Sequence, residues 1–294
     1  MKLAHCGRSL DLERVAVMGI LNVTPDSFFN GGRYDDIADA IERGMRLDDE
    51  GAAIIDVGGE STRPGAEPVP EDEELARVIP VIEALAARSG AAISIDTRKP
   101  SVAQRAVEAG ATILNDTLGE EGPPSSPSSS PSSSPPSSMA EVAAATGAAL
   151  VTMHSRGMPQ TMTRLTDYSD VVADTVAWLK SRAEALEGAG LERDAIVLDP
   201  GIGFAKTAEQ SLMLLKRLDE LVALGYPVLS GTSHKSFIGA VLDVPPEGRL
   251  NGTAATVAWA VAKGARLVRV HDVAPALQVA RMTEAIAAGR PPAQ

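Results

Sequence analysis

Short apolar runs that end in polar residues recur eight times along the chain. They end at Asn22, Asp56, Asp96, Asn115–Asp116, His154, Asp199, Ser233–Lys235, and Arg269 with His271. The segments between the runs are long enough for a helix and its loops, and this alternation is typical of a (β/α)8 TIM barrel. Because the active groups of such barrels lie at the C-terminal ends of the parallel strands, we predict that these polar residues share one rim.

The remaining pattern predicts the helices and a capping hairpin. Residues 1–13 alternate weakly around a Gly-Arg-Ser turn, which indicates a β-hairpin that closes the N-terminal end of the barrel. The first barrel strand is predicted to begin near Val15. Apolar residues at helical spacing predict helices over 36–50, 71–88, 100–109, 139–146, 168–189, 207–224, 252–263 and 275–288.

One segment interrupts this order. Residues 122–138 contain only Gly, Pro and Ser, so they offer nothing to a hydrophobic core and are predicted to be disordered. Because barrel-like units continue on both sides, we interpret the segment as an insertion between the fourth strand and the fourth helix and not as a domain boundary. Residues 1–294 are then one domain. The insertion could act as a lid on the rim, but its composition favours a solvated spacer.

Composition and charge narrow the class of partner. Hydrophobic residues make up 44% of the chain but aromatic residues only 3%, so aliphatic side chains must fill the core. A formal charge of −12 argues against sequence-independent binding to nucleic acid or to an anionic membrane, which leaves a small molecule as the expected partner. Cys6 is the single cysteine, which excludes an intrachain disulfide. Without a long apolar stretch or a signal peptide, we expect a cytoplasmic protein.

The acidic and amide residues on the predicted rim suit a flat heterocycle. Asp96, Asn115 and Asp199 together could recognise the donors and acceptors along one edge of such a ring, since carboxylates accept from N–H groups and an amide does both. Lys235 could donate to a ring carbonyl or nitrogen. The alternative is that Lys235 and Asp199 form a structural salt bridge.

Basic residues on the same rim indicate an anionic substrate. They are the histidines His154, His234 and His271, together with Arg63, Lys235 and Arg269. A positive rim in an acidic protein points to a phosphate or diphosphate. Asn22 offers one neutral oxygen, which suits an Mg²⁺ ion otherwise held by water and substrate phosphate. Alternatively, Asn22 only anchors its loop and Arg63 is a solvated loop residue.

Eight ordered motifs make the chain similar to the dihydropteroate synthases, which have a pterin-binding (β/α)8 fold. They are GILNVTPDSF (19–28), DVGGESTRPG (56–65), SIDTRKP (94–100), ILND (113–116), TMHSRGMPQTM (152–162), LDPGIGFAKT (198–207), SGTSHKSFIG (230–239) and RVHDV (269–273). The resemblance runs from about residue 15 to 288, apart from the insertion.

The resemblance implies a transferase of folate biosynthesis that joins 6-hydroxymethyl-7,8-dihydropterin diphosphate to p-aminobenzoate, with loss of pyrophosphate. It implies that Asp96, Asn115, Asp199 and Lys235 bind the pterin, with Met153 and Phe204 nearby, and that Asn22 contacts Mg²⁺ on the diphosphate. Arg63, Arg269 and His271 would hold the diphosphate, and Phe28, Thr62, Pro64 and Ser236 would form the p-aminobenzoate site that sulfonamides also occupy. Arg63, Asp96, Lys235, Arg269 and His271 are the implied catalytic residues. A homodimer is also implied.

Several positions depart from the pattern of this family. Asn30 replaces an aspartate in the first loop, His234 stands where an arginine is frequent, and Ala205 and Ser211 replace a glycine and an asparagine. Asn30 and the insertion leave a non-catalytic pterin-binding paralogue as one alternative. A pterin-binding methyltransferase is a second alternative, which the DVGGESTRPG loop and the SHKSF lysine disfavour.

Overall fold

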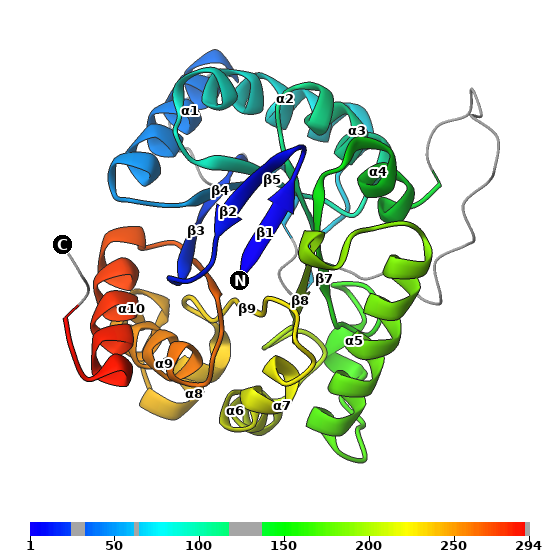
Figure 1. The fold of residues 1–294 in the computed structure, drawn as a ribbon. Helices are drawn as coiled ribbons and strands as arrows, with labels where there is room; N and C mark the ends of the chain where they lie inside the picture. Colours follow the sequence, from blue (N-terminus) through cyan, green and yellow to red (C-terminus); the bar gives the residue numbers. More distant parts are fainter. Residues whose placement is uncertain (25–32, 62–64, 118–136, 292–294) are drawn as a thin grey trace.

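The computed structural model describes residues 1–24, 33–61, 65–117 and 137–291 (Figure 1). Eight parallel strands form one sheet in the order β8-β7-β6-β5-β4-β3-β10-β9. The strands are β3 (Ala16–Asn22), β4 (Ile54–Gly58), β5 (Ala92–Asp96), β6 (Ile113–Asp116), β7 (Ala149–Met153), β8 (Ile196–Asp199), β9 (Leu229–Ser230) and β10 (Leu267–Val270). A parallel bridge between Leu198 and Val228 brings the two outer strands together. The predicted TIM barrel is therefore confirmed.

Helices surround the barrel in the expected alternation (Figure 1). They are α1 (Arg33–Asp49), α2 (Glu71–Arg88), α3 (Pro100–Glu108), α4 (Met139–Thr146), α5 (Val171–Gly188), α6 (Ala208–Lys216), α7 (Leu218–Val222), α8 (Ser236–Leu242), α9 (Leu250–Ala262) and α10 (Val273–Ala288). The helix predicted over 207–224 was wrong as one element, because Arg217 has φ −110° and ψ 27° and separates α6 from α7. Helix α8 was missed because seven residues are too short for a periodic pattern.

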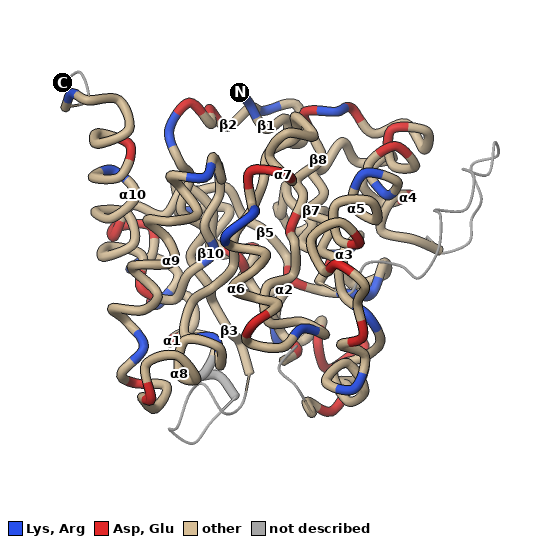
Figure 2. The backbone as a smooth tube through the Cα atoms, turned by 90° about the horizontal axis from the view of Figure 1, so that it is seen from below, with Lys and Arg blue, Asp and Glu red and all other residues tan. Residues whose placement is uncertain are grey.

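The N-terminal hairpin closes one end of the barrel. Strands β1 (Lys2–His5) and β2 (Arg8–Asp11) pair antiparallel, as predicted, and Figure 1 shows them crossing the barrel axis. Leu3 and Leu12 pack with side chains inside the barrel, among them Met18, Ile54 and Leu267. Figure 2 shows this hairpin at the opposite end from the C-terminal end of β3. The hairpin therefore does not cover the end of the barrel where the predicted site residues lie.

A second, larger core lies between the strands and the helices. Aliphatic side chains dominate it, with members such as Leu21, Ile55, Ile95 and Leu114 fully or almost fully buried. This agrees with the low aromatic content, since branched aliphatic residues fill the layers of such barrels. Acidic and basic residues are spread over the outer helices (Figure 2). None of the helices in the described part of the chain is long and apolar enough to cross a membrane.

The end of the Ser/Pro insertion is ordered. Ser138 caps α4, because its Oγ accepts a hydrogen bond from the backbone N–H of Glu141, and its side chain is 3% exposed. Ser137 donates through its Oγ to the Glu141 carboxylate at 3.0 Å. The prediction of disorder over 122–138 was therefore wrong for these two residues, which satisfy the first turn of a helix as N-cap serines do. The rest of the insertion, 122–136, lies outside the described residues.

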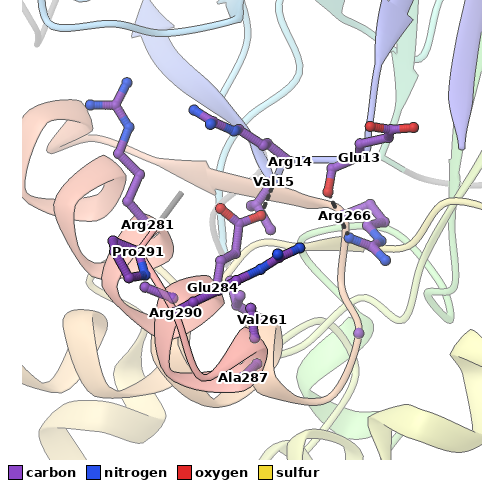
Figure 3. Close-up of a pocket in the computed structure, with 13 residues that line it drawn as sticks. Glu13, Arg14, Val15, Val261, Arg266, Arg281, Glu284, Ala287, Arg290 and Pro291 are labelled. Carbon is purple, nitrogen blue, oxygen red and sulfur yellow. Dashed lines mark hydrogen bonds between the residues drawn. The ribbon is translucent and has the colours of Figure 1, made fainter. Parts of the chain in front are cut away.

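One cavity of about 740 Å³ lies at the hairpin end of the barrel, between α9, α10 and the start of β3 (Figure 3). The side chains of Arg14, Arg281 and Arg290 line it and are exposed. Glu284 accepts a hydrogen bond from the backbone N–H of Val15 at 2.6 Å, which ties α10 to the first barrel strand. None of the predicted site residues lines this cavity.

Candidate active site

Parallel register brings the predicted polar residues side by side at the C-terminal ends of the strands. Asp96 lies opposite Asn115 in the pairing of β5 with β6, and Gly58 lies opposite Asp96 in the pairing of β4 with β5. Met153 lies opposite Asp199 in the pairing of β7 with β8. Neighbouring strands therefore deliver Asp96, Asn115 and Asp199 to one end of the barrel, as predicted.

A buried cluster of charges is centred on Arg269 of β10. Its Nε donates to Asp56 Oδ2 at 2.6 Å, and its Nη2 donates to Asp96 Oδ2 at 2.6 Å. The Asn115 amide donates to the same Asp56 oxygen at 2.8 Å, and Thr117 Oγ1 donates to Asp96 Oδ1 at 3.2 Å. Strands β4, β5, β6 and β10 are thus joined through one guanidinium and two carboxylates. These hydrogen bonds fix the orientation of the side chains that take part.

Burial changes the protonation of Asp96. Desolvation raises the pKa of its carboxyl to about 7, although the charge of Arg269 acts in the opposite direction, and the neighbouring Asp56 carboxylate raises this pKa further. A carboxyl that titrates near neutral pH can exchange a proton with a ligand or accept from its N–H groups, and such shifts are typical of functional sites.

A second group of residues comes from the β8 and β9 ends. Lys235 donates through Nζ to the carbonyl of Ile202, and its Nζ lies 4.4 Å from the centre of the Phe204 ring. Asp199 accepts from the backbone N–H of Gly201 at 2.7 Å. Lys235 and Asp199 make no direct ion pair among the described residues, although the charge of each acts on the pKa of the other. Burial lowers the pKa of Lys235 to about 8 and raises the pKa of Asp199.

Glycines allow the loop after β8 to approach this group. Gly201 has φ +63°, and a Cβ atom there would lie 2.0 Å from the carbonyl oxygen of His154. Gly203 has φ +85°, and its Cβ would lie 3.0 Å from Lys235 Cδ. Ala205 also adopts a positive φ, of +48°, where a glycine would be free of the strain that a side chain brings. The departure at Ala205 therefore costs backbone strain of about 1 kcal/mol.

Two of the three strand-end histidines do not serve the predicted positive rim. His154 is buried against the Tyr168 and Trp178 rings, and burial followed by the charge of Lys206 lowers its pKa to about 3, so it is neutral. The expectation of a cationic His154 was wrong. His234 points its Nε2 at Asp272 Oδ2, 2.6 Å away, so any positive charge on it is matched by a carboxylate.

His271 and Asn22 share a cavity. The two residues line a hollow of about 530 Å³ together with Arg43 and other residues of α1 and β3. Ser233 Oγ lies 2.9 Å from Nδ1 of His271 and orients its ring, and Arg43 donates to the His271 carbonyl at 3.0 Å. Among the described residues no group of three acidic, histidine or cysteine side chains could hold a metal ion. A single amide oxygen at Asn22 fits an Mg²⁺ ion that arrives with substrate phosphate.

The other predicted residues are placed as follows. Met153 ends β7 and is buried, and Ser236 is the exposed first residue of α8, next to Lys235. Five residues named in the sequence analysis lie outside the described part of the chain, namely Phe28, Asn30, Thr62, Arg63 and Pro64.

Sequence reasoning placed Asp56 and Ser233 on the rim but gave them no role in the site, and it missed Thr117 and Lys206. Asp56 ends an apolar pair just as Asp96 does, so the same signal could have assigned it to the site. Thr117 follows the strand-end residues Asn115 and Asp116 but carries no charge to mark it. Lys206 had no signal, because a lysine ahead of a helix is ordinarily solvated.

Comparison with known proteins agrees with this geometry. Residues 18–271 match the family described as pterin binding enzyme. A dihydropteroate synthase of Bacillus subtilis is 47% identical over 274 residues, covering 93% of this chain and 89% of its own. A Xanthomonas albilineans dihydropteroate synthase structure with 4-aminobenzoic acid has a TM-score of 0.87 at 40% identity, covering 98% of this chain and 99% of its own. The same enzyme in complex with 7,8-dihydropteroate gives 0.84 at 38% identity, covering 98% and 99%. This chain therefore belongs to the pterin-binding enzyme family and, within it, to the dihydropteroate synthases, which are transferases.

Proposed function

We propose that this chain joins p-aminobenzoate to 6-hydroxymethyl-7,8-dihydropterin diphosphate and releases 7,8-dihydropteroate and pyrophosphate. The observation that carries the proposal is the pairing of Arg269 with both Asp56 and Asp96 at the C-terminal end of the barrel. This pairing holds a buried set of hydrogen-bond acceptors in fixed positions. Relatives in the same family bind 4-aminobenzoate and dihydropteroate. Sulfonamides, which a relative from Yersinia pestis also binds, would occupy the p-aminobenzoate site.

The pterin ring would lie between the two groups of rim residues. Asp96, Asn115 and Asp199 would accept from and donate to its polar edge, and Lys235 would donate to a ring nitrogen or carbonyl. Phe204 and Met153 would pack against the ring. Because the carboxylates are oriented by Arg269, Thr117 and Gly201 before any ligand arrives, little reorganisation accompanies binding.

The diphosphate would lie toward Asn22, Arg269 and His271, with Arg63 as a further cation. Asn22 would contact Mg²⁺, which supplies positive charge for the leaving diphosphate when bound. His271 would donate to a phosphate oxygen, oriented by Ser233. These residues would stabilise negative charge as it develops on the leaving group.

The reaction requires little acid–base help from the protein. The arylamine nitrogen of p-aminobenzoate forms a bond to the methylene carbon of the pterin, the bond from that carbon to the diphosphate oxygen breaks, and the nitrogen then loses a proton to solvent. An arylamine is a neutral nucleophile at pH 7, so no strong base is needed. The electron-rich dihydropterin and the nearby carboxylates stabilise positive character on the carbon. Phe28, Thr62, Pro64 and Ser236 would surround the arylamine.

We also propose that residues 1–294 act as one domain and assemble as a homodimer. Large apolar side chains are exposed on three neighbouring helices, with Trp259 on α9 at 49%, and Met282 and Ile286 on α10 at 62% and 69%. Leu212 and Met213 of α6 are also exposed. The Trp259 indole donates to the Leu215 carbonyl at 2.8 Å, so the α6 and α9 surfaces are continuous. A shared apolar face of this kind favours self-association. A cytoplasmic location stays a prediction.

Pyrophosphate release tests the function. Purified protein with both substrates and Mg²⁺ should release pyrophosphate, and omission of p-aminobenzoate or addition of EDTA should stop it. Quenching of pterin fluorescence without pyrophosphate release would instead support a non-catalytic pterin-binding paralogue. Methyl transfer from a methylated folate to a corrinoid protein would support the methyltransferase alternative.

A further inference from the structure

Lys206 is a buried lysine next to the rim, at the end of the loop between β8 and α6. Its side chain is 9% exposed although lysines are almost never this buried. The next residue, Thr207, caps α6 in a capping box with Gln210, which fixes the backbone at this point. The loop therefore presents Lys206 inward at the same place where the helix begins.

The ammonium group of Lys206 contacts three acceptors from two segments. Its Nζ lies 3.0 Å from Nδ1 of His154 and 3.1 Å from the His154 carbonyl oxygen, at the end of β7. It also donates to the carbonyl oxygen of Phe204 at 3.0 Å. All three hydrogen-bond acceptors are neutral groups, and burial lowers the pKa of Lys206 to about 7, although the nearby Asp199 carboxylate acts in the opposite direction. Burial of an amine without a direct ion pair is costly, and retention of such a group favours a role in the site.

His154, which contacts the Lys206 ammonium, is itself held in place by neighbouring rings and by a backbone hydrogen bond. Its ring lies 5.3 Å from the Trp178 ring and 6.0 Å from the Tyr168 ring, and its backbone N–H donates to the Asp199 carbonyl at 2.9 Å. Because the ring is neutral, Nδ1 can accept from the ammonium. Lys206 therefore ties the loop after β8 to a part of the barrel that cannot shift easily.

The loop that Lys206 holds carries a wall of the proposed pterin pocket. Phe204 lies two residues before Lys206, and its ring lies 4.4 Å from Nζ of Lys235. The Ile202 carbonyl of the same loop accepts from Lys235. If the loop moved, the Phe204 ring would lose its position and the Lys235 ammonium its acceptor, whereas the Arg269 cluster would keep its own hydrogen bonds to Asp56 and Asp96.

We propose that Lys206 is a positioning residue for the pterin half of the reaction: it holds the loop after β8 against His154 and so fixes Phe204 and Lys235. This inference rests on the proposed function, because it assumes that Phe204 and Lys235 face the pterin. The groups that surround the Lys206 ammonium are His154, Asp199, Lys235, Arg156 and the Tyr168 ring. Asp199 is the acidic one among them, and it favours the charged form of Lys206.

The test compares Lys206→Met with Lys180→Met. Methionine keeps an unbranched apolar stem but cannot donate, and Lys180 is a matched control on the exposed face of α5, where it pairs only with Glu184 at 3.9 Å. Affinity for 6-hydroxymethylpterin is measured by fluorescence, KM for each substrate by pyrophosphate release, and Tm by calorimetry. For Lys206→Met we expect pterin affinity to fall about tenfold, as for loss of charged hydrogen bonds, while KM for p-aminobenzoate changes less than about twofold.

Unchanged pterin affinity, or equal changes in the KM values of both substrates, would overturn the positioning role. Should Lys206→Met fail to fold, Lys206→Ala with added ethylammonium serves instead: recovery of pterin affinity with ethylammonium but not with sodium supports the role, and no recovery contradicts it. A wild-type protein that binds pterin but releases no pyrophosphate contradicts the proposed function alone, since the fluorescence comparison does not require turnover.

Discussion

Asp56 offers the sharpest perturbation of the charge cluster, because it is fully buried and one of its oxygens serves two donors. Oδ2 accepts from Arg269 at 2.6 Å and from Asn115 at 2.8 Å, whereas Oδ1 is buried without a hydrogen-bond partner among the described residues. In Asp56→Asn, the amide oxygen can replace Oδ2 and keep both hydrogen bonds. The amide NH2 must then replace Oδ1, where it meets no acceptor.

The cost follows from these contacts. An unsatisfied buried donor costs about 1–3 kcal/mol, and loss of the charge opposite Arg269 brings the total to about 3–5 kcal/mol, the range for breaking a buried ion pair. For a protein of this size we expect Tm to fall by roughly 6–20 °C. The assay is urea unfolding together with calorimetry, and the control is Asp194→Asn in the exposed Arg193–Ala195 turn, expected to change by less than about 0.5 kcal/mol.

The same substitution has a second readout in the pterin site. The Asp56 carboxylate raises the pKa of Asp96, so its loss should lower that pKa and move the acid limb of pterin binding to lower pH. Equal stability of Asp56→Asn and Asp194→Asn, together with an unmoved acid limb, would refute the reasoning that Asp56 organises the cluster.

Three further predictions follow from the site and the surface. Affinity for 6-hydroxymethylpterin should rise as the pH increases through about 7, where Asp96 loses its proton and becomes a full acceptor. It should fall above about 8, where Lys235 loses its charge. Asp96→Asn should abolish the rise at acid pH, and a wild-type affinity that stays constant across this pH range argues against both assignments. Ser138→Ala should lower the free energy of unfolding by about 1 kcal/mol through loss of the α4 cap. Deletion of 122–136 should leave kcat unchanged, and a large loss of kcat in the deletion variant would instead favour a lid. Ile286→Glu should convert a dimer to a monomer in sedimentation velocity, with Glu187→Gln as a control outside the apolar face, and a wild-type monomer would contradict the proposed interface.

The apolar-to-polar pattern was enough to predict the barrel and the rim, because parallel strands in register place their last residues side by side. Asp96, Asn115 and Asp199 follow from that rule alone. The pattern could not predict that Arg269 would pair with Asp56 and Asp96, since 213 and 173 residues separate it from these partners. Strand order identifies the neighbours, but only side-chain packing decides which charges meet.

Burial accounts for the error at His154. This residue lies at a strand end, so a cationic role on the rim was expected for it, whereas nothing in the sequence singled out Lys206. In the structure the Lys206 and His154 side chains are in contact, although 52 residues separate them in the sequence. The Tyr168 and Trp178 rings pack beside them. Helix α8 escaped prediction for a different reason, since its seven residues begin directly after the Lys235 loop.

The most direct test of the central claim is the mass of the product. Purified protein should be given 6-hydroxymethyl-7,8-dihydropterin diphosphate, isotope-labelled p-aminobenzoate and Mg²⁺, and the mixture analysed by mass spectrometry alongside a pyrophosphate assay. The account predicts labelled 7,8-dihydropteroate in equal amount to pyrophosphate, with both lost in Asp96→Ala. Pterin binding without labelled product, under conditions where a Bacillus subtilis relative forms it, would contradict the account.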